Sequence, residues 1–251
     1  MKKVCGIMAL LAVAGLAAKG ARADTVYDTT EQTTGYIDQQ TGNNFYSLGE
    51  QVTVASPGQV LQSIAIDFGS SYYNGSSNGS PFTYTPDITL SIYDSAADAN
   101  LQGSTGLIGA AVVSNVQFSN DGVVDPVFRY NFEDEQLLTF DFGSQNIVLP
   151  STFVFAYHDS PPAGSNVDGA NGLSVGLTAQ AATTGTSYQS TFDSYPNGSP
   201  SVLDYSWDAG LNIEARITTV ATPLPSAAGM GLGLFGLIGA GKLLRRKPRV
   251  A

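Results

Sequence analysis

The sequence predicts an all-β domain, a β-sandwich of jelly-roll type, flanked by two short segments of different character. Three observations favour this class. Short apolar runs of alternating polarity follow one another from about residue 26 to residue 220, separated by Gly, Asn, Asp, Ser and Pro. No stretch of comparable length has a helical period. Hydrophobic residues make up 43% of the chain against 13% charged residues, which is enough to bury a core.

The expected strands are short, and turn residues separate them. Alternation of polar and apolar residues is clearest in 60–68 and 137–142. In chain order, strands are expected at 51–55, 60–68, 88–93, 107–118, 127–132, 137–142, 152–158, 172–178, 187–192, 202–207 and 211–219. This number of strands in one domain is typical of two packed sheets, and an up-and-down barrel is the structural alternative.

Charge is divided sharply along the chain. All 21 acidic residues lie between Asp24 and Glu214, and the only basic residues from position 24 to position 241 are Arg129 and Arg216, so this central span carries a formal charge of −19. The remaining basic residues lie before position 24 or after position 241. We expect no nucleic-acid partner for this domain, because binding requires Lys and Arg to neutralise phosphates.

The first 23 residues have the pattern of a secretory signal peptide. Two lysines precede an uncharged run over 4–18, and Ala21 and Ala23 fit the small-x-small rule for cleavage. We expect the export machinery and signal peptidase to act here, so that the mature chain begins at Asp24 and lacks Cys5, the only cysteine. Without disulfides, the domain must rely on its core. An uncleaved membrane anchor is the alternative interpretation.

The last segment, 222–251, has three parts in order. The motif Pro223-Leu224-Pro225 comes first, an uncharged Gly-rich stretch over 227–241 follows, and a basic cluster ends the chain. As a helix, the uncharged stretch and the next three residues would reach about 27 Å, enough to insert into a thin bilayer. The positive-inside rule keeps the basic cluster in the cytoplasm and the acidic domain outside. The basic residues are Lys242, Arg245, Arg246, Lys247 and Arg249.

This order of parts resembles the PEP-CTERM sorting signal of exported bacterial proteins, in a variant with Leu224 where Glu is usual. The resemblance covers about 222–249 and implies cleavage by a membrane-embedded exosortase, so that the membrane contact is transient. Two alternatives remain open. A sortase substrate is one, because 224–228 approaches the Leu-Pro-x-Thr-Gly pattern, and a permanent transmembrane anchor is the other.

The intervening domain, 24–221, is similar to the β-rich choice-of-anchor group that accompanies such sorting signals. The similarity rests on the strand patterns of 137–142, 147–150 and 152–157, and on Trp207 followed by 214–217. It implies a surface-associated protein without an assigned chemistry. The chain is thus divided into a signal peptide over 1–23, a β domain over 24–221 and a sorting segment over 222–251.

The sequence contains no recognised catalytic motif, so we expect the protein not to be an enzyme. It has no Gly-x-Ser-x-Gly elbow and no cysteine in the mature chain. His158 and Asp159 are more simply the polar end of a strand than a catalytic base. The alternative is a secreted glycoside hydrolase or other carbohydrate-active enzyme, which needs only two suitably separated carboxylates. Its candidate residues are Glu133, Glu135, Asp141 and Glu214.

Loop composition favours a binding role. Asp94, Asp98 and Asn100 in one expected loop, and Asp121 and Asp125 in another, offer oxygen ligands of the kind that calcium prefers, although neither loop matches an EF-hand. Asx turns without metal are the simpler interpretation.

Tyrosines near Asn and Asp would stack on sugars, although burial at strand ends is the alternative. They are Tyr72, Tyr73, Tyr84, Tyr195 and Tyr205. We therefore expect an exported, non-enzymatic cell-surface or extracellular-matrix protein that binds extracellular polysaccharide or calcium through its loops.

Overall fold

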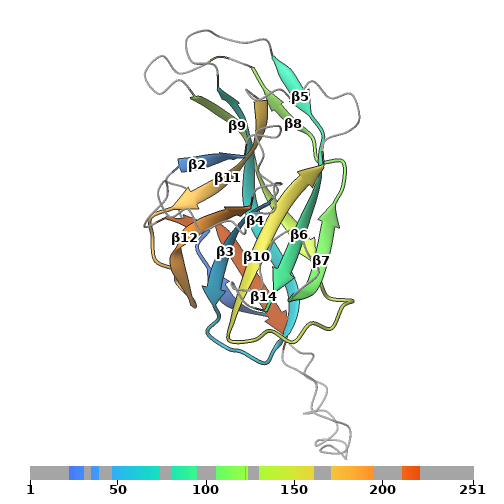
Figure 1. Cartoon of the computed structure of the whole chain (residues 1–251), viewed down its shortest axis with the longest axis vertical. Helices are drawn as coiled ribbons and strands as arrows, with labels where there is room; N and C mark the ends of the chain where they lie inside the picture. Colours follow the sequence, from blue (N-terminus) through green and yellow to red (C-terminus); the bar gives the residue numbers. More distant parts are fainter. Residues whose placement is uncertain are drawn as a thin grey trace, which may run out of the picture. The chain divides into compact units, whose positions relative to one another are not determined.

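Antiparallel strands form all the regular secondary structure in the described part of the computed structural model (Figure 1). The model describes residues 23–30, 35–39, 47–73, 81–94, 106–121, 123, 130–160, 171–194 and 211–220. These ranges contain fourteen strands and no helix, which confirms the all-β class. All the strands lie within one unit, Arg22–Ala221.

The larger sheet is organised around one long strand, β4 (Val60–Tyr73). One edge of β4 pairs with β9 (Tyr130–Asp141), and the other edge pairs with two strands in succession, β14 (Ala215–Val220) and β11 (Asn171–Thr178). Three further strands complete the sheet. They are β1 (Ala23–Asp28) beside β14, and β2 (Gly35–Gln39) and β13 (Asn212–Ile213) beside β11.

The smaller sheet has five strands, and a two-stranded ribbon lies apart from it. The order in the sheet is β12 (Thr186–Ser194), β3 (Ser47–Thr53), β10 (Thr152–Ser160), β6 (Asp87–Tyr93) and β7 (Leu107–Val113). The ribbon consists of β5 (Phe82–Tyr84) and β8 (Phe118–Asn120) and lies at one end of the domain (Figure 1).

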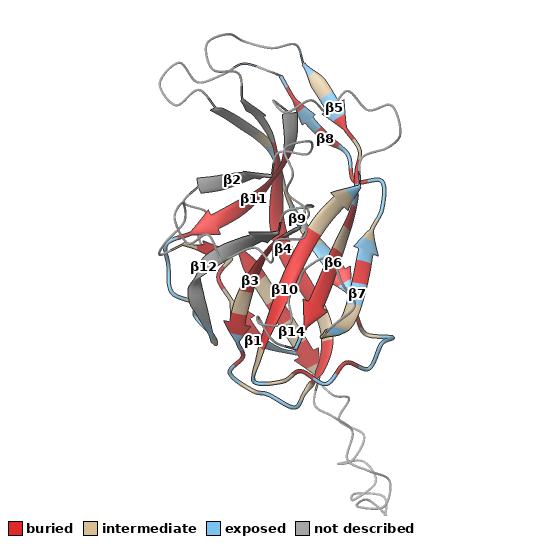
Figure 2. Ribbon diagram, in the orientation of Figure 1, coloured by how far each residue is buried: buried red, intermediate tan, exposed pale blue. Residues whose placement is uncertain are grey.

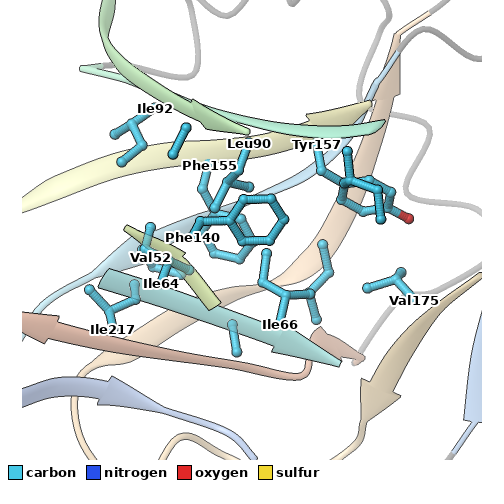
Figure 3. Packing of buried hydrophobic residues seen from close by; sticks show 14 of the residues in the cluster. Val52, Ile64, Ile66, Leu90, Ile92, Phe140, Phe155, Tyr157, Val175 and Ile217 are labelled. Atoms are coloured by element: carbon cyan, nitrogen blue, oxygen red, sulfur yellow. The ribbon is translucent and has the colours of Figure 1, made fainter. Parts of the chain in front are cut away.

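The core forms where alternating apolar residues from the two sheets meet, because successive side chains of a strand point to opposite faces (Figure 3). Phe68 lies edge-on to Tyr157 of the smaller sheet, with ring centroids 4.9 Å apart, and to Phe140 of its own sheet at 6.2 Å. Figure 2 shows that buried residues follow β4, β6, β10 and β11. This arrangement is that of a β-sandwich-like fold.

Several expected strands change their limits in the structure. The expected strand over 107–118 is wrong as one element, because the chain leaves β7 and turns at Asn115, whose φ is 55°. Asn tolerates this left-handed conformation better than most residues. The strands expected at 127–132 and 137–142 join into β9 instead. The strands β1, β2 and β5 were not expected from the sequence, and the expected strand over 202–207 lies outside the described residues.

The two segments expected to be targeting signals, 1–23 and 222–251, lie almost wholly outside the described residues. Ala23 and Asp24, at the expected cleavage point, begin β1 and pair with Val220 and Thr219. Ala21, the proline motif, the hydrophobic stretch and the basic cluster are not among the described residues. Within the ranges that are described, no helix is long and apolar enough to cross a membrane.

Candidate functional site: a pocket beside the β5–β8 ribbon

A β-bulge in β9 directs acidic side chains toward the ribbon. Glu133 pairs with Ser70 and Gln136 pairs with Phe68, so two residues of β9 oppose the single Gly69 of β4. One of the two is Asp134, whose φ of 54° marks the bulge. A bulge bends its strand and re-aims its side chains, and the acidic residues here are turned toward β8.

Carboxylates of the bulge accept hydrogen bonds from the backbone of the ribbon. Ser119 N donates to Asp134 Oδ2, and Asp121 N donates to Glu133 Oε2, both at 2.7 Å. Gln136 Nε2 donates to the carbonyl of Gln117 at 2.8 Å. These bonds satisfy backbone groups of β8 and of the residues on either side of it.

Two buried residues, Ser70 of β4 and Asn120 of β8, connect the ribbon to β4 by hydrogen bonds. Ser70 Oγ donates to Ser119 O at 2.7 Å. Asn120 is only 2% exposed, and its amide lies 3.4 Å from Ser70 Oγ. Asn120 is therefore a structural residue of the ribbon.

A pocket of about 370 Å³ that is open to solvent lies between the ribbon and the bulge. We call it the ribbon pocket. The described part of its wall combines one aromatic ring, hydroxyl groups, an amide and carboxylates, and contains no basic side chain. The lining residues are Pro81, Phe82, Thr83, Ser119, Asn120, Asp121 and Glu133. Such a wall offers hydrogen-bond acceptors and one partly buried apolar surface, which suits a polar ligand without negative charge.

Of the five calcium candidates, only Asp94 and Asp121 are among the described residues. Asp94 is exposed at the end of β6, whereas Asp98, Asn100 and Asp125 lie outside the described residues. Asp121 Oδ1 accepts a hydrogen bond from Val123 N at 2.7 Å, which is the Asx turn expected from composition. No three His, Cys, Asp or Glu side chains in the described ranges are arranged to hold a metal.

The strand-end pair His158 and Asp159 lies below the ribbon rather than in the pocket. The Tyr84 hydroxyl, on β5, donates to Asp159 Oδ2. Burial raises the pKa of Asp159 to about 7, and burial also lowers the pKa of His158. Tyr84 matches the alternative of burial at a strand end rather than that of a sugar-stacking ring, because it is only 2% exposed.

The other carboxylates of the hydrolase alternative are spread over the larger sheet. Glu135 and Asp141 are exposed on β9, and Asp141 Oδ1 accepts a hydrogen bond from Gly143 N at 2.8 Å. Glu214 is buried between β13 and β14. Of the four, only Glu133 lines the ribbon pocket, where it adjoins Asp121. Sequence reasoning did not find this pair because twelve positions separate its members.

Comparison with protein-family models, with curated proteins and with solved structures finds no match to this chain. The geometry of the described residues therefore carries the functional argument by itself.

Proposed function

We propose that this chain is an exported, non-enzymatic cell-surface or extracellular-matrix protein whose β-sandwich, of jelly-roll type, binds a neutral polysaccharide in the ribbon pocket. The observation that carries the proposal is the pocket wall itself. It sets Phe82 beside Asn120, Asp121 and Glu133 in an open hollow. Sugars are bound by this combination, because a ring packs on their apolar faces and carboxylates accept hydrogen bonds from their hydroxyl groups.

Electrostatics favours a neutral ligand over an acidic one. From position 24 to position 221 the chain carries a formal charge of −19, and the described residues that line the pocket include no Lys or Arg. An acidic polysaccharide would meet repulsion, which weakens as salt screens it. A neutral polysaccharide would meet no such electrostatic repulsion.

Export is the second part of the proposal. The signal peptide over 1–23 directs the chain across the membrane, and an exosortase-like enzyme processes the tail that begins with the proline motif at 223–225. The hydrophobic stretch holds the protein in the membrane until that step. Cell fractionation with and without the processing enzyme tests this part: we expect the protein to accumulate in the membrane fraction when the enzyme is removed. Equal distribution in both strains would contradict processing.

Polysaccharide binding is tested with the exported protein on an array of neutral and acidic glycans. We expect retention on neutral glycans, and a loss of about tenfold or more in affinity when Asp121→Asn is combined with Phe82→Ala, because both a hydrogen-bond acceptor and a ring contact are weakened. Glu135→Gln on the exposed part of β9 is the matched control and should bind normally.

Two outcomes would replace the proposal. Retention on no glycan, with the protein folded, would remove the binding function. Release of reducing sugar that is lost in Glu133→Gln, with folding intact, would place the protein among the glycoside hydrolases instead.

A further inference from the structure

The last strand of the domain, β14, ends far from the ribbon pocket. Its final residue, Val220, pairs with Val60 at the start of β4 (Figure 1). Near the other end of β4, Ser70 bonds to Ser119 in the pocket wall. Ten positions separate Val60 from Ser70, which corresponds to roughly 33 Å of extended strand. A pull on a ligand in the pocket and on the chain beyond Val220 therefore acts along β4.

The direction of β14 decides how such a pull acts on it. The strand runs antiparallel to β4, from Ala215 opposite Ile66 to Val220 opposite Val60, so it points away from the ribbon. Hydrogen bonds of an antiparallel pair lie perpendicular to the strands. A force along β14 therefore loads all the bonds of the pair together, in shear. A force across the end of β14 would instead break them one after another.

Both edges of β14 are paired. One edge pairs with β4, and the other pairs with β1 from Ala23 to Asp28. Thr29 extends this second contact, because its N donates to Ala215 O at 2.9 Å and its Oγ1 accepts a hydrogen bond from Ala215 N, also at 2.9 Å. The strand that leads to the tail is thus held between two neighbours, whereas a strand at the edge of a sheet has only one.

Side-chain hydrogen bonds reinforce β14 on the side of β4. Thr218 Oγ1 and Ser63 Oγ of β4 are hydrogen-bonded at 2.7 Å. Thr219 Oγ1 donates to Oε1 of Gln59, the residue just before β4. Thr219 is 0% exposed, so water does not readily replace this bond. Both bonds lie in the last half of β14, close to the point where the tail continues.

On the side of β1, β14 uses a residue type that is scarce in this domain. Arg129 and Arg216 are the only basic residues from position 24 to position 241. Arg216 Nε pairs with Asp28 Oδ2 at 2.8 Å, and Arg216 Nη2 donates to Thr30 Oγ1 at 2.6 Å. One of the two cations of a strongly acidic domain therefore fastens β14 to β1 and to the residues that follow it.

We propose that β14, held between β1 and β4, transmits mechanical force between the tail and a ligand bound at the ribbon. The partner is a large polymer or surface that stays fixed while the attached protein is pulled. Shear loading suits this role, because the rate of forced unfolding, rather than the equilibrium stability, decides how long the attachment lasts. The inference rests on the proposed function in one respect only, the attachment of the chain through its tail.

Single-molecule pulling on the full chain, purified in detergent, compares two directions of force on the same strand. One handle is fixed to the C-terminus, and the second is fixed to an exposed cysteine, either Glu135→Cys on β9 or Pro57→Cys in the turn before β4. Cys5→Ser removes the natural cysteine. The handle at Glu135 loads β14 in shear, whereas the handle at Pro57 separates β14 from β4 at the Val220 end. We expect a rupture force at least about threefold higher for the handle at Glu135.

A matched pair of substitutions assigns the resistance to β14. Thr218→Val removes the hydroxyl bond to Ser63 and should raise the unfolding rate at constant shear force about fivefold, the effect of one hydrogen bond. Arg216→Met should act in the same direction. Thr152→Val removes the similar bond to Thr53, at 2.9 Å in the smaller sheet, and should leave this rate unchanged.

Three results would overturn the proposal. One is an equal rupture force for the two handle positions. Another is an equal effect of Thr218→Val and Thr152→Val on the unfolding rate under shear. The third is a rate that Thr218→Val and Arg216→Met both leave unchanged. Because the pulling experiment uses neither a glycan nor a processing enzyme, its outcome is independent of the array and fractionation experiments that test the proposed function.

Discussion

In two regions of this protein, carboxylates accept hydrogen bonds from backbone N–H groups. One region is buried in the core and the other is exposed to solvent. Inside the sandwich, Glu50 is 0% exposed. Its Oε2 accepts a hydrogen bond from Ile213 N at 2.6 Å, and its Oε1 accepts one from the Tyr27 hydroxyl at 3.2 Å. Glu50 belongs to the smaller sheet, whereas both donors belong to the larger one, so this carboxylate links the two sheets across the core.

At the ribbon, the corresponding bonds are made in contact with solvent. Asp134 is exposed and Glu133 is partly exposed, although their bonds to Ser119 N and Asp121 N, both 2.7 Å, are nearly as short as the 2.6 Å bond of Glu50 to Ile213 N. The comparison teaches that bond length does not decide how much these contacts stabilise the fold. Burial does, because a lost partner in the core leaves polar groups without water, whereas a lost partner at the ribbon is replaced by water.

The largest effect is expected for Glu50→Ala. Removing the carboxylate leaves Ile213 N and the Tyr27 hydroxyl without this acceptor inside the core, so the free energy of unfolding should fall by about 3–5 kcal/mol. Urea denaturation followed by circular dichroism measures it. Glu50→Gln keeps one acceptor oxygen and should lose less. A loss below about 1 kcal/mol for Glu50→Ala would show that the buried bond is no stronger than those of the ribbon.

An intermediate effect is expected for Asp159, which lies between the two regions, below the ribbon. Its folded-state pKa of about 7 exceeds the reference value of 3.8, so folding favours the protonated carboxyl. The stability contributed by this group is therefore complete below about pH 4 and is lost as pH rises toward 7, by at most about 4 kcal/mol at 1.4 kcal/mol per pKa unit.

Asp159→Asn should remove this loss when the unfolding free energy is compared between pH 4 and pH 7. The variant keeps an acceptor for the Tyr84 hydroxyl, so the fold should persist. His158 acts in the opposite direction, because burial lowers its pKa and its contribution is lost as pH falls below 6.5. A variant with the same pH dependence as the wild type would show that Asp159 is not the titrating group.

The smallest effect is expected for Asp134→Gly at the bulge. Glycine accepts the φ of 54° but removes the acceptor of Ser119 N, so unfolding should cost about 1 kcal/mol less. Hydrogen exchange should accelerate at Ser119 while amides of β10 keep their protection. Asp134→Asn retains an acceptor and serves as the control. Equal acceleration in β10 would mean that the ribbon does not open separately from the sandwich.

Local pattern predicted much of the framework of this fold. The alternation around Ile64 and Phe68 and around Phe140 does mark the core faces of β4 and β9, because a strand has a period of two. It failed where the chain departs from that period. A shift in register at Gln62 turns both Leu61 and Ile64 into the core, and the bulge at Asp134 carries β9 through an acidic run that resembled a loop.

The sequence by itself determined the all-β class of the described domain, the acidity of that domain and the composition of its turns, because these follow from residue type and local periodicity. Tertiary structure alone decided which polar residues meet. Asp121 and Glu133 line one pocket, Asp67 and Glu214 converge over Gly176, and Tyr84 is buried against Asp159. The physical reason is that antiparallel pairing joins residues far apart in the chain, and the resulting register depends on bulges and strand crossings that no local pattern encodes.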